Sequence, residues 1–261
     1  MIIYIIIFIL FIILFIILLY IIYLNNFNNI NESFINNNEK YTAVIIEPRK
    51  HSALEFVLEN FLTNLDDNWN FIIFHGNVNK EYVNNIINNK LLKYKKKITL
   101  KNLNVDNLNL KDYNNLLVSK EFYNEIPTEV FLIFKTDSII CSDYKNLINI
   151  YIKYDYVGAP WKDKNIGNGG LSLRRKTKML EIINKCKYKN EPEDVYFSLS
   201  CPNINRNTPS FEEAKKFSVE MVYNDISFGV HKPWVHLKKQ YISNKNNFCQ
   251  GLNKLINLNK R

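Results

Sequence analysis

The sequence has little glycine, proline and cysteine. Seven glycines and seven prolines in 261 residues exclude collagen-like and linker-dominated proteins. The four cysteines, Cys141, Cys186, Cys201 and Cys249, show no Cys-x-x-Cys or other metal-binding spacing, and they form either two disulfides or four thiols. Hydrophobic residues make up 47% of the chain, which excludes a disordered protein and allows a sizeable core.

Arginine is also scarce, because 29 of the 34 basic residues are lysine. A net charge of +9 ordinarily points to a nucleic-acid partner. The lysines are scattered, however, and arginine is the residue that best matches phosphates and base edges. The chain contains 41 asparagines, and Asn, Lys, Ile, Tyr and Phe share A/T-rich codons. We therefore interpret the charge as coding bias and predict no nucleic-acid partner.

One long apolar run covers residues 2–24, which contain no charge, glycine or proline. A helix over this run rises about 1.5 Å per residue and crosses a hydrocarbon core about 30 Å thick. The run lacks the basic start and the small-residue cleavage site of a signal peptide. We expect a transmembrane anchor at 2–24, an Asn-rich polar stem at 25–40 and a single-pass type II membrane protein; the flanking charges leave the side of the membrane open.

After the stem, short apolar runs alternate with segments of helical spacing. The runs predict buried strands at 41–46 and 71–74, a third strand at 98–100, and a fourth at 129–134, which has the strongest pattern. The helical spacing predicts helices within 54–65, 80–92 and 144–152. Ser52 and Glu55 form a capping box for the first helix, and Ser142 or Asp143 caps the last. Continuous apolar strands separated by amphipathic helices predict an α/β fold with a mostly parallel sheet covered on both faces.

Polar segments follow two of these strands, where ligands of such sheets bind. The first strand ends in Glu47-Pro48-Arg49, and the strand at 129–134 ends in Lys135-Thr136-Asp137-Ser138. Four further segments come downstream: GAPW (158–161), GNGGLSLRR (167–175), EPEDVYF (191–197) and SFGVHKPW (227–234).

In this order and spacing, the segments resemble a nucleotide-sugar glycosyltransferase of the GT-A fold. More narrowly, they are similar to an uncharacterised glycosyltransferase-like family with EPR, TDS, GAPW, GNGGLSLR, PEDV and GVHKPW segments. The resemblance covers residues 41–234 and excludes the anchor, the stem and a Lys/Asn-rich tail at 235–261. It implies a GT-A-like α/β domain, with a mostly parallel central sheet flanked by helices, that uses a nucleotide-sugar donor.

The resemblance implies a divalent metal, Mn²⁺ or Mg²⁺, bound by Asp137 and His231. The family pattern is Asp-x-Asp, and here Lys135 replaces the first carboxylate. A carboxylate and a neutral imidazole suit Mn²⁺. Without the resemblance, Asp137 reads as a turn cap and His231 as a structural histidine.

The resemblance also implies that Asp194 is the base that accepts the proton of the acceptor hydroxyl. Glu193 and Asp194 after Pro192 are equally suited to the start of any helix. Gly169 and Gly170 are expected to let the backbone approach the donor sugar, with Glu193 also at the donor.

Four further residues are expected near the donor. Arg49 would pair with the diphosphate and Glu47 with the ribose or base, although the two also suit a local ion pair. Trp161 and Trp234 each follow a proline and are expected as pocket walls, with a core position as the alternative.

The sequence therefore predicts a membrane-anchored, hexosyltransferase-like enzyme. It would transfer a sugar, with inversion, from a donor expected to be UDP-linked to a hydroxyl of a glycan or protein. The alternative is a catalytically inactive GT-A-like domain that binds a glycan or protein at the membrane, motivated by the missing first carboxylate of Asp-x-Asp.

Overall fold

A six-stranded sheet forms the centre of the computed structural model, which describes residues 40–260. Its strand order is β3-β2-β1-β4-β7-β6. The pairs from β3 to β4 are parallel, while β7 runs antiparallel to both β4 and β6. The strands are β1 (Tyr41–Ile46), β2 (Trp69–His75), β3 (Ile98–Asn102), β4 (Val130–Phe134), β6 (Tyr156–Pro160) and β7 (Ile166–Arg175).

A smaller sheet has the order β5-β9-β8. It consists of β5 (Ser138–Ile140), β8 (Ser218–Val219) and β9 (Gly229–His231). β9 lies between the other two, antiparallel to β5 and parallel to β8.

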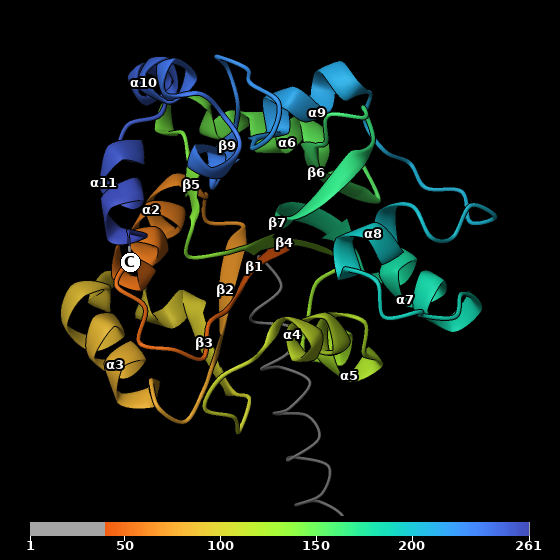
Figure 1. The fold of residues 1–261 in the computed structure, drawn as a ribbon. Helices are drawn as coiled ribbons and strands as arrows, with labels where there is room; N and C mark the ends of the chain where they lie inside the picture. Colours follow the sequence, from red (N-terminus) through yellow and green to blue (C-terminus); the bar gives the residue numbers. More distant parts are fainter. Residues whose placement is uncertain (1–39, 261) are drawn as a thin grey trace, which may run out of the picture. The chain divides into compact units, whose positions relative to one another are not determined.

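Helices cover both faces of the large sheet (Figure 1). The α-helices of residues 40–260 are α2 (Leu54–Asn64), α3 (Lys80–Asn85), α4 (Leu110–Leu117), α5 (Lys120–Asn124), α6 (Ile148–Tyr151), α7 (Lys176–Lys185), α8 (Glu193–Ser198), α9 (Phe211–Phe217), α10 (Lys239–Phe248) and α11 (Leu252–Leu258). A π-helix spans Ile86–Lys90, and 3-10 helices span Leu92–Lys97, Ser142–Leu147 and Pro233–Val235.

Alternate residues of the central strands build two separate cores. Ala43 and Ile45 of β1 belong to a core that includes buried residues of α2, α3 and α11. Val44 and Ile46 belong to another that includes residues of α4, α5, α7 and α8. Successive strand residues point to opposite faces, so a continuous apolar strand needs cover on both sides. The predicted mixed α/β fold with a mostly parallel, helix-flanked sheet is thus confirmed.

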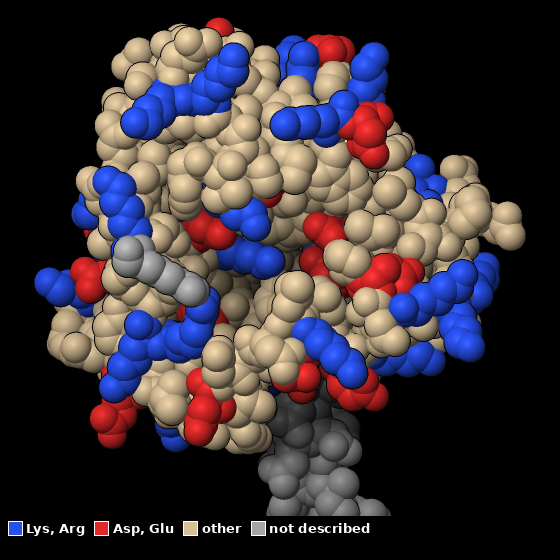
Figure 2. All heavy atoms as spheres, viewed as in Figure 1, with Lys and Arg blue, Asp and Glu red and all other residues tan. Residues whose placement is uncertain are grey.

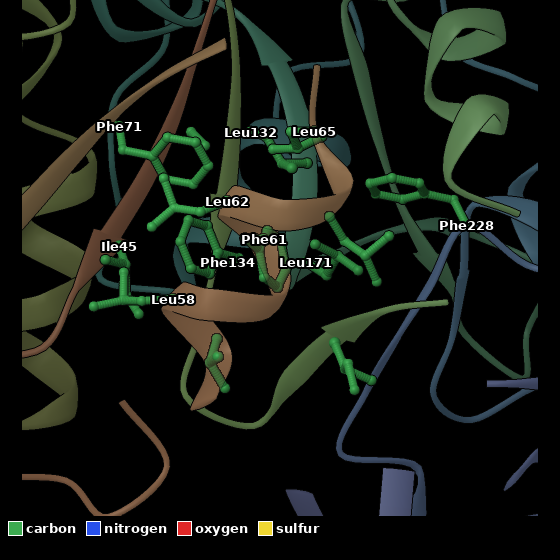
Figure 3. Packing of buried hydrophobic residues seen from close by; sticks show 14 of the residues in the cluster. Ile45, Leu58, Phe61, Leu62, Leu65, Phe71, Leu132, Phe134, Leu171 and Phe228 are labelled. Carbon is green, nitrogen blue, oxygen red and sulfur yellow. The ribbon is translucent and has the colours of Figure 1, made fainter. Parts of the chain in front are cut away.

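Aromatic packing fixes the end of β4. The ring of Phe61 in α2 stacks on that of Phe134, with centroids 3.9 Å apart, and Phe71 of β2 meets Phe134 edge-on (Figure 3). Burying each such side chain contributes about 1.5–3 kcal/mol. Phe134 is the last residue of β4, so this packing sets where Lys135 and Asp137 leave the sheet.

Both predicted helix caps are wrong. α2 begins after Ala53 without a side-chain cap, because the Ser52 hydroxyl donates instead to the carbonyl of Leu258, 2.6 Å away. The 3-10 helix at Ser142–Leu147 likewise begins after Cys141 without a side-chain cap. A capping box does occur on α9, between Ser210 and Glu213.

The predicted helix at 80–92 is shorter and less regular than expected. α3 ends at Asn85, and the chain continues as the π-helix to Lys90. The predicted strands are all present, and β1 has the predicted bounds.

The described residues of the predicted tail, 235–260, belong to the same compact unit as residues 40–234. Leu255 of α11 is fully buried in the core. The Asn259 side chain donates to the carbonyl of Thr136 at 3.0 Å. The compact unit therefore extends beyond Trp234 and includes α10 and α11.

The predicted anchor at 2–24 and the stem up to residue 39 lie outside the described residues. Within residues 40–260, no helix has both the length and the apolarity to cross a membrane.

Two disulfides settle the cysteine question that the sequence left open. Cys141 pairs with Cys249, and Cys186 pairs with Cys201, with Cα atoms 4.4 and 6.1 Å apart. The first bridge spans 108 residues and joins the residue after β5 to the end of α10, whereas the second spans 15.

We predict that the protein, isolated without a reducing agent, has no free thiol until it is reduced. Replacing Cys141 and Cys249 with serine should cost more stability than replacing Cys186 and Cys201, because cross-links contribute about 4.7 kcal/mol for a 100-residue loop and about 3 kcal/mol for a 15-residue loop. Alkylation with mass spectrometry counts the thiols, and thermal unfolding ranks the variants. Four reactive thiols before reduction would contradict the pairing.

Candidate functional site

The site lies where the topology of the sheet changes direction. β1 is followed in the sheet by β2 on one side, while β4 lies on its other side. Loops that leave the carboxyl ends of two such strands diverge and open a crevice. Here the loops are Glu47-Pro48-Arg49 after β1 and Lys135-Thr136-Asp137 after β4.

Two adjoining cavities occupy this crevice, with volumes of about 530 and 260 Å³. Arg49, Thr136 and Asp137 line both of them. Figure 2 shows the hollow on this face, with basic and acidic atoms around it.

The larger cavity is positively charged. Arg49, Lys50, Lys232 and Lys260 line it, and Asp137 is the one carboxylate among its described lining residues. A concave surface lined by one sign of charge concentrates ligands of the opposite sign. The cavity is therefore suited to an anionic ligand such as a diphosphate.

Strand pairing brings Asp137 to His231. In the small sheet, Ser138 of β5 lies opposite His231 of β9, and the Lys232 amide donates to the Asp137 carbonyl at 2.9 Å. His231 Nε2 lies 3.1 Å from Asp137 Oδ1. The side chain of His231 is 2% exposed and that of Asp137 is 24% exposed. The two residues thus meet at the edge of the cavity although 94 positions separate them in the sequence.

These two side chains fit a divalent metal ion. Neither Asp137 Oδ1 nor His231 Nε2 has a hydrogen-bond partner within residues 40–260, although both atoms are buried. Adjacent ligands at about 2.1 Å from an octahedral ion lie about 3.0 Å apart, close to the observed separation. The described residues hold no group of three His, Cys, Asp or Glu side chains placed to bind a metal. A two-residue site suits Mg²⁺-like ions, which keep waters and substrate phosphates as their other ligands.

The electrostatics of the pair also suit a cation. Burial alone raises the pKa of Asp137, but the adjacent His231, Lys135 and Lys232 together hold it well below its ordinary value. Burial lowers the pKa of His231, and Asp137 and Glu220 outweigh this and raise it. The Asp137 carboxylate is therefore ionised at neutral pH, as a metal ligand must be.

A second acidic residue lies on the far side of the imidazole. Glu220 Oε1 is 3.3 Å from His231 Nδ1 and 3.6 Å from His236 Nε2. The side chain of Glu220 is 1% exposed. Sequence reasoning did not identify Glu220 or His236 as site residues; an acidic residue inside the largely apolar run 217–222 was the available signal.

The glycines of β7 allow the site residues to pack closely. A Cβ on Gly170 would overlap the imidazole of His231, and a Cβ on Gly169 would overlap the carboxylate of Glu193. The Gly169 amide donates to Asp194 Oδ2 at 3.1 Å, and the Gly170 amide donates to Asn168 Oδ1 at 3.0 Å. Packing within the protein therefore accounts for both glycines, and their contact with a donor sugar stays a prediction.

Asp194 lies in the first turn of α8, half-buried. Its carboxylate accepts the Gly169 amide and, at 2.9 Å, its neighbouring Val195 amide. Burial and the adjacent Glu193 raise its pKa, against the lowering effect of the Gly169 amide and Arg174. Asp194 thus contacts Gly169, and His231 packs against the next residue of β7, Gly170.

Glu193 forms a buried ion pair with Arg174 of β7. Arg174 donates to both carboxylate oxygens, at 2.7 and 3.0 Å, and its Nε donates to the Ser172 hydroxyl at 3.0 Å. The Arg174 side chain is 0% exposed, and the rings of Tyr156 and Phe197 lie beside its guanidinium. Both Glu193 oxygens therefore already have a partner, so its predicted donor contact competes with a structural role.

Glu47 and Arg49 form the local ion pair that the sequence left as an alternative. Arg49 Nε donates to Glu47 Oε1 at 2.7 Å and its Nη2 donates to Oε2 at 2.8 Å. Glu47 is buried, whereas the Arg49 side chain is 45% exposed and lines both cavities. The buried Asn79 side chain holds this turn by donating to the carbonyls of Glu47 and Arg49.

The two tryptophans differ in position. Trp234 lines the larger cavity and packs against the core. Trp161 is half-buried and lies beside Gly167. The prediction that either contacts a donor remains a prediction.

Tyr113 of α4 is a further residue beside the smaller cavity. It lines the smaller cavity, with the Lys135 ammonium 4.5 Å from its ring centre. Burial raises its pKa well above the ordinary value, and Glu193, Asp137 and Asp194 raise it further. Tyr113 is thus within electrostatic range of both Asp137 and Asp194. No local pattern marks it in the sequence, because its position depends on the packing of α4 against α8.

The fold resembles that of a solved glycosyltransferase. GlyE from Streptococcus pneumoniae TIGR4 matches with a TM-score of 0.51 and 10% identity, over 84% of this chain and 62% of GlyE. This chain therefore spans less than two thirds of GlyE.

Two other structures match less well. HddC from Yersinia pseudotuberculosis has a TM-score of 0.41 and 13% identity, over 63% of this chain and 87% of HddC. The mannosyltransferase PcManGT from Pyrobaculum calidifontis, in complex with GDP-Man and Mn²⁺, has a TM-score of 0.44 and 11% identity, over 61% of this chain and 51% of its own.

The molecule thus has a glycosyltransferase-like fold. A family model described as "Protein of unknown function (DUF5672)" matches residues 97–231, about half of the sequence, and the chain belongs to this family. No curated protein sequence matches the chain.

We predict that Arg174→Met destabilises the protein by about 3–5 kcal/mol, because it leaves the buried Glu193 carboxylate unpaired. The double variant R174M/E193M should recover much of this loss. Denaturant unfolding measures each free energy. Lys178→Met is the matched control, because the Lys178–Glu181 pair is partly exposed and worth less than about 1 kcal/mol. Equal losses in R174M and K178M would contradict the role of the buried pair.

Proposed function

We propose that this protein is a metal-dependent glycosyltransferase that moves a sugar from a nucleotide-sugar donor to an acceptor hydroxyl. The observation that carries the proposal is the meeting of Asp137 and His231, 3.1 Å apart, beside a cation-lined cavity. The cavity lies at the switch point of a sheet with a glycosyltransferase-like fold. Asp194 contacts Gly169, and His231 packs against the adjacent Gly170.

The residues of the larger cavity would bind the donor. Arg49, Lys50, Lys232 and Lys260 offer charge-assisted hydrogen bonds to a diphosphate. Asp137 and His231 would hold Mn²⁺ or Mg²⁺. A divalent cation bound there stabilises the negative charge of the departing nucleoside diphosphate.

Asp194 would act as the base. Its carboxylate takes the proton from the acceptor hydroxyl while the hydroxyl oxygen forms a bond to the anomeric carbon and the bond from that carbon to the diphosphate breaks. The sugar is transferred with inversion. Two amide donors hold the carboxylate in place, and burial together with the adjacent Glu193 raises its pKa, which makes it a stronger base than an exposed aspartate.

We further propose that the donor is UDP-linked, that the acceptor is a glycan or protein, and that residues 2–24 anchor the enzyme as a single-pass type II protein. The two disulfides support a site on the oxidising side of the membrane. Four reduced cysteines in protein isolated from membranes would instead favour the cytosolic side.

A second candidate is a catalytically inactive domain that binds a glycan or protein. It is favoured by the single carboxylate at the metal site, where Lys135 replaces the first acid of Asp-x-Asp. Such a domain would bind its ligand without releasing nucleoside diphosphate.

We predict that full-length protein in detergent, with Mn²⁺ and an acceptor mixture, releases nucleoside diphosphate from at least one member of a panel of UDP- and GDP-sugars. Asp194→Asn should lower kcat by about 10²–10⁴-fold, because it removes the base, while donor binding persists. Asp137→Ala should lose Mn²⁺-dependent donor binding. Chromatography measures turnover, and calorimetry measures binding.

Asp66→Asn is the control, because Asp66 precedes β2 at the opposite end of the sheet. Full activity in D194N would refute the role of Asp194 as base. A wild-type protein that binds glycan but neither binds nor hydrolyses any donor would instead support the binding module.

We also predict a pH dependence for kcat/KM. Asp194 works as a base only when ionised, so activity should fall as the pH drops through its pKa. Because that pKa is raised, the acid limb should lie above the ordinary aspartate value of 3.8. The residual activity of D194N should lack this limb. A limb at or below 3.8 in the wild-type profile would contradict the assignment.

A further inference from the structure

Glu220 is a buried acid that the reaction described above does not use. It follows β8 directly, in the sheet whose strand β9 carries His231. Its side chain is 1% exposed, and neither carboxylate oxygen has a hydrogen-bond partner among the described residues. A buried carboxylate is costly unless nearby groups compensate for its lost hydration. Its position therefore requires an explanation.

Two histidine nitrogens lie close to the Glu220 carboxylate. Glu220 Oε1 lies 3.3 Å from His231 Nδ1 and 3.6 Å from His236 Nε2. His231 Nε2, on the other side of the same ring, lies 3.1 Å from Asp137. The imidazole of His231 therefore has a carboxylate at each nitrogen, one at the cavity and one inside the protein.

The ring is also held from its side. A Cβ on Gly170 would overlap three atoms of the His231 imidazole, so the backbone of β7 packs directly against it. Ser138 next to Asp137 donates to the Gly170 carbonyl at 3.2 Å, which ties the same β7 residue to β5. Packing against Gly170 limits where the ring lies. The contact with Glu220, on the interior side of the ring, is made by Nδ1 and so distinguishes Nδ1 from Nε2.

We propose that Glu220 is a positioning residue for His231. Resting on the proposed function, this inference adds a residue to the metal site. Glu220 keeps a proton on Nδ1, so that the lone pair of Nε2 faces Asp137 and the cation. Histidines that bind metals commonly direct their other ring nitrogen to a carboxylate, which fixes the tautomer and strengthens the ligand. His236 Nε2, 3.6 Å from Glu220 Oε1, is a second ring nitrogen beside this carboxylate.

The test measures Mn²⁺ binding to the full-length protein without donor, by the electron paramagnetic resonance signal of free Mn²⁺, alongside thermal unfolding. Glu220→Met removes the acceptor and should weaken Mn²⁺ binding about 10–100-fold. Glu220→Gln keeps an acceptor but loses the charge, and it should weaken binding about fivefold. E220Q decides the outcome if E220M does not fold.

Glu213→Gln is the matched control. Glu213 lies in α9 and accepts hydrogen bonds from Ser210 and Tyr154, so its loss should lower stability without changing Mn²⁺ affinity. Variants of Glu220 that lose stability but bind Mn²⁺ like the wild type would show that Glu220 only supports the fold, and would overturn the proposal.

Asp137→Ala and His231→Ala separate this inference from the proposed function. If both abolish Mn²⁺ binding while the Glu220 variants retain it, only the role of Glu220 is refuted. If the wild type does not bind Mn²⁺ at all, the metal site itself is refuted and Glu220 has no ligand to position.

Discussion

The absence of a Cβ at Gly169 and Gly170 is the constraint on which the site depends. The carboxylate of Glu193 takes the space beside Gly169, and the imidazole of His231 takes the space beside Gly170. Two parts of the chain that are 38 residues apart thereby pack against consecutive residues of one strand. Any larger residue at either position would separate α8 or β9 from β7. The glycines are thus explained by packing, whatever else they contact.

Three unrelated parts of the fold support this arrangement. The Arg174–Glu193 pair joins β7 to α8 at the residue before Asp194. Because the pair is buried, the packing of α8 against β7 is sensitive to the loss of either charge. The pairing of β5 with β9 places Asp137 opposite His231. The C-terminal segment completes the cavity, because Asn259 bonds to the Thr136 carbonyl and Lys260 lines the wall. The disulfide between Cys141 and Cys249 fastens that segment to the strand that follows Asp137.

Local patterns in the sequence predicted four strands and three helices among residues 41–152, and non-local contacts explain part of what they missed. Apolar runs identified the four parallel strands of the large sheet, and the runs are longest in strands such as β1 and β4, which are buried on both faces and must be apolar throughout. Ser52 had the right spacing for a cap, yet it bonds to Leu258, a residue 206 positions away. The tail is rich in Lys and Asn, but Leu252 and Leu255 within it are fully buried in the core. Arg174 sits in a run that ends in two arginines, and only its distant partner Glu193 distinguishes the buried one from Arg175. Tyr113 and Glu220 likewise depend on contacts that no short motif encodes.

The two aspartates of the site have opposite electrostatic environments, and this supports different roles for them. Asp137 faces His231, Lys135 and Lys232, which lower its pKa despite burial. Burial and the charge of Glu193 raise the pKa of Asp194, although two backbone amides donate to its carboxylate. A carboxylate with a lowered pKa is a weak base and a permanent anion, suited to hold a cation. One with a raised pKa gains basicity and suits proton transfer. The arrangement of neighbouring charges is therefore a second argument for the proposed roles, independent of the order of the two carboxylates in the sequence.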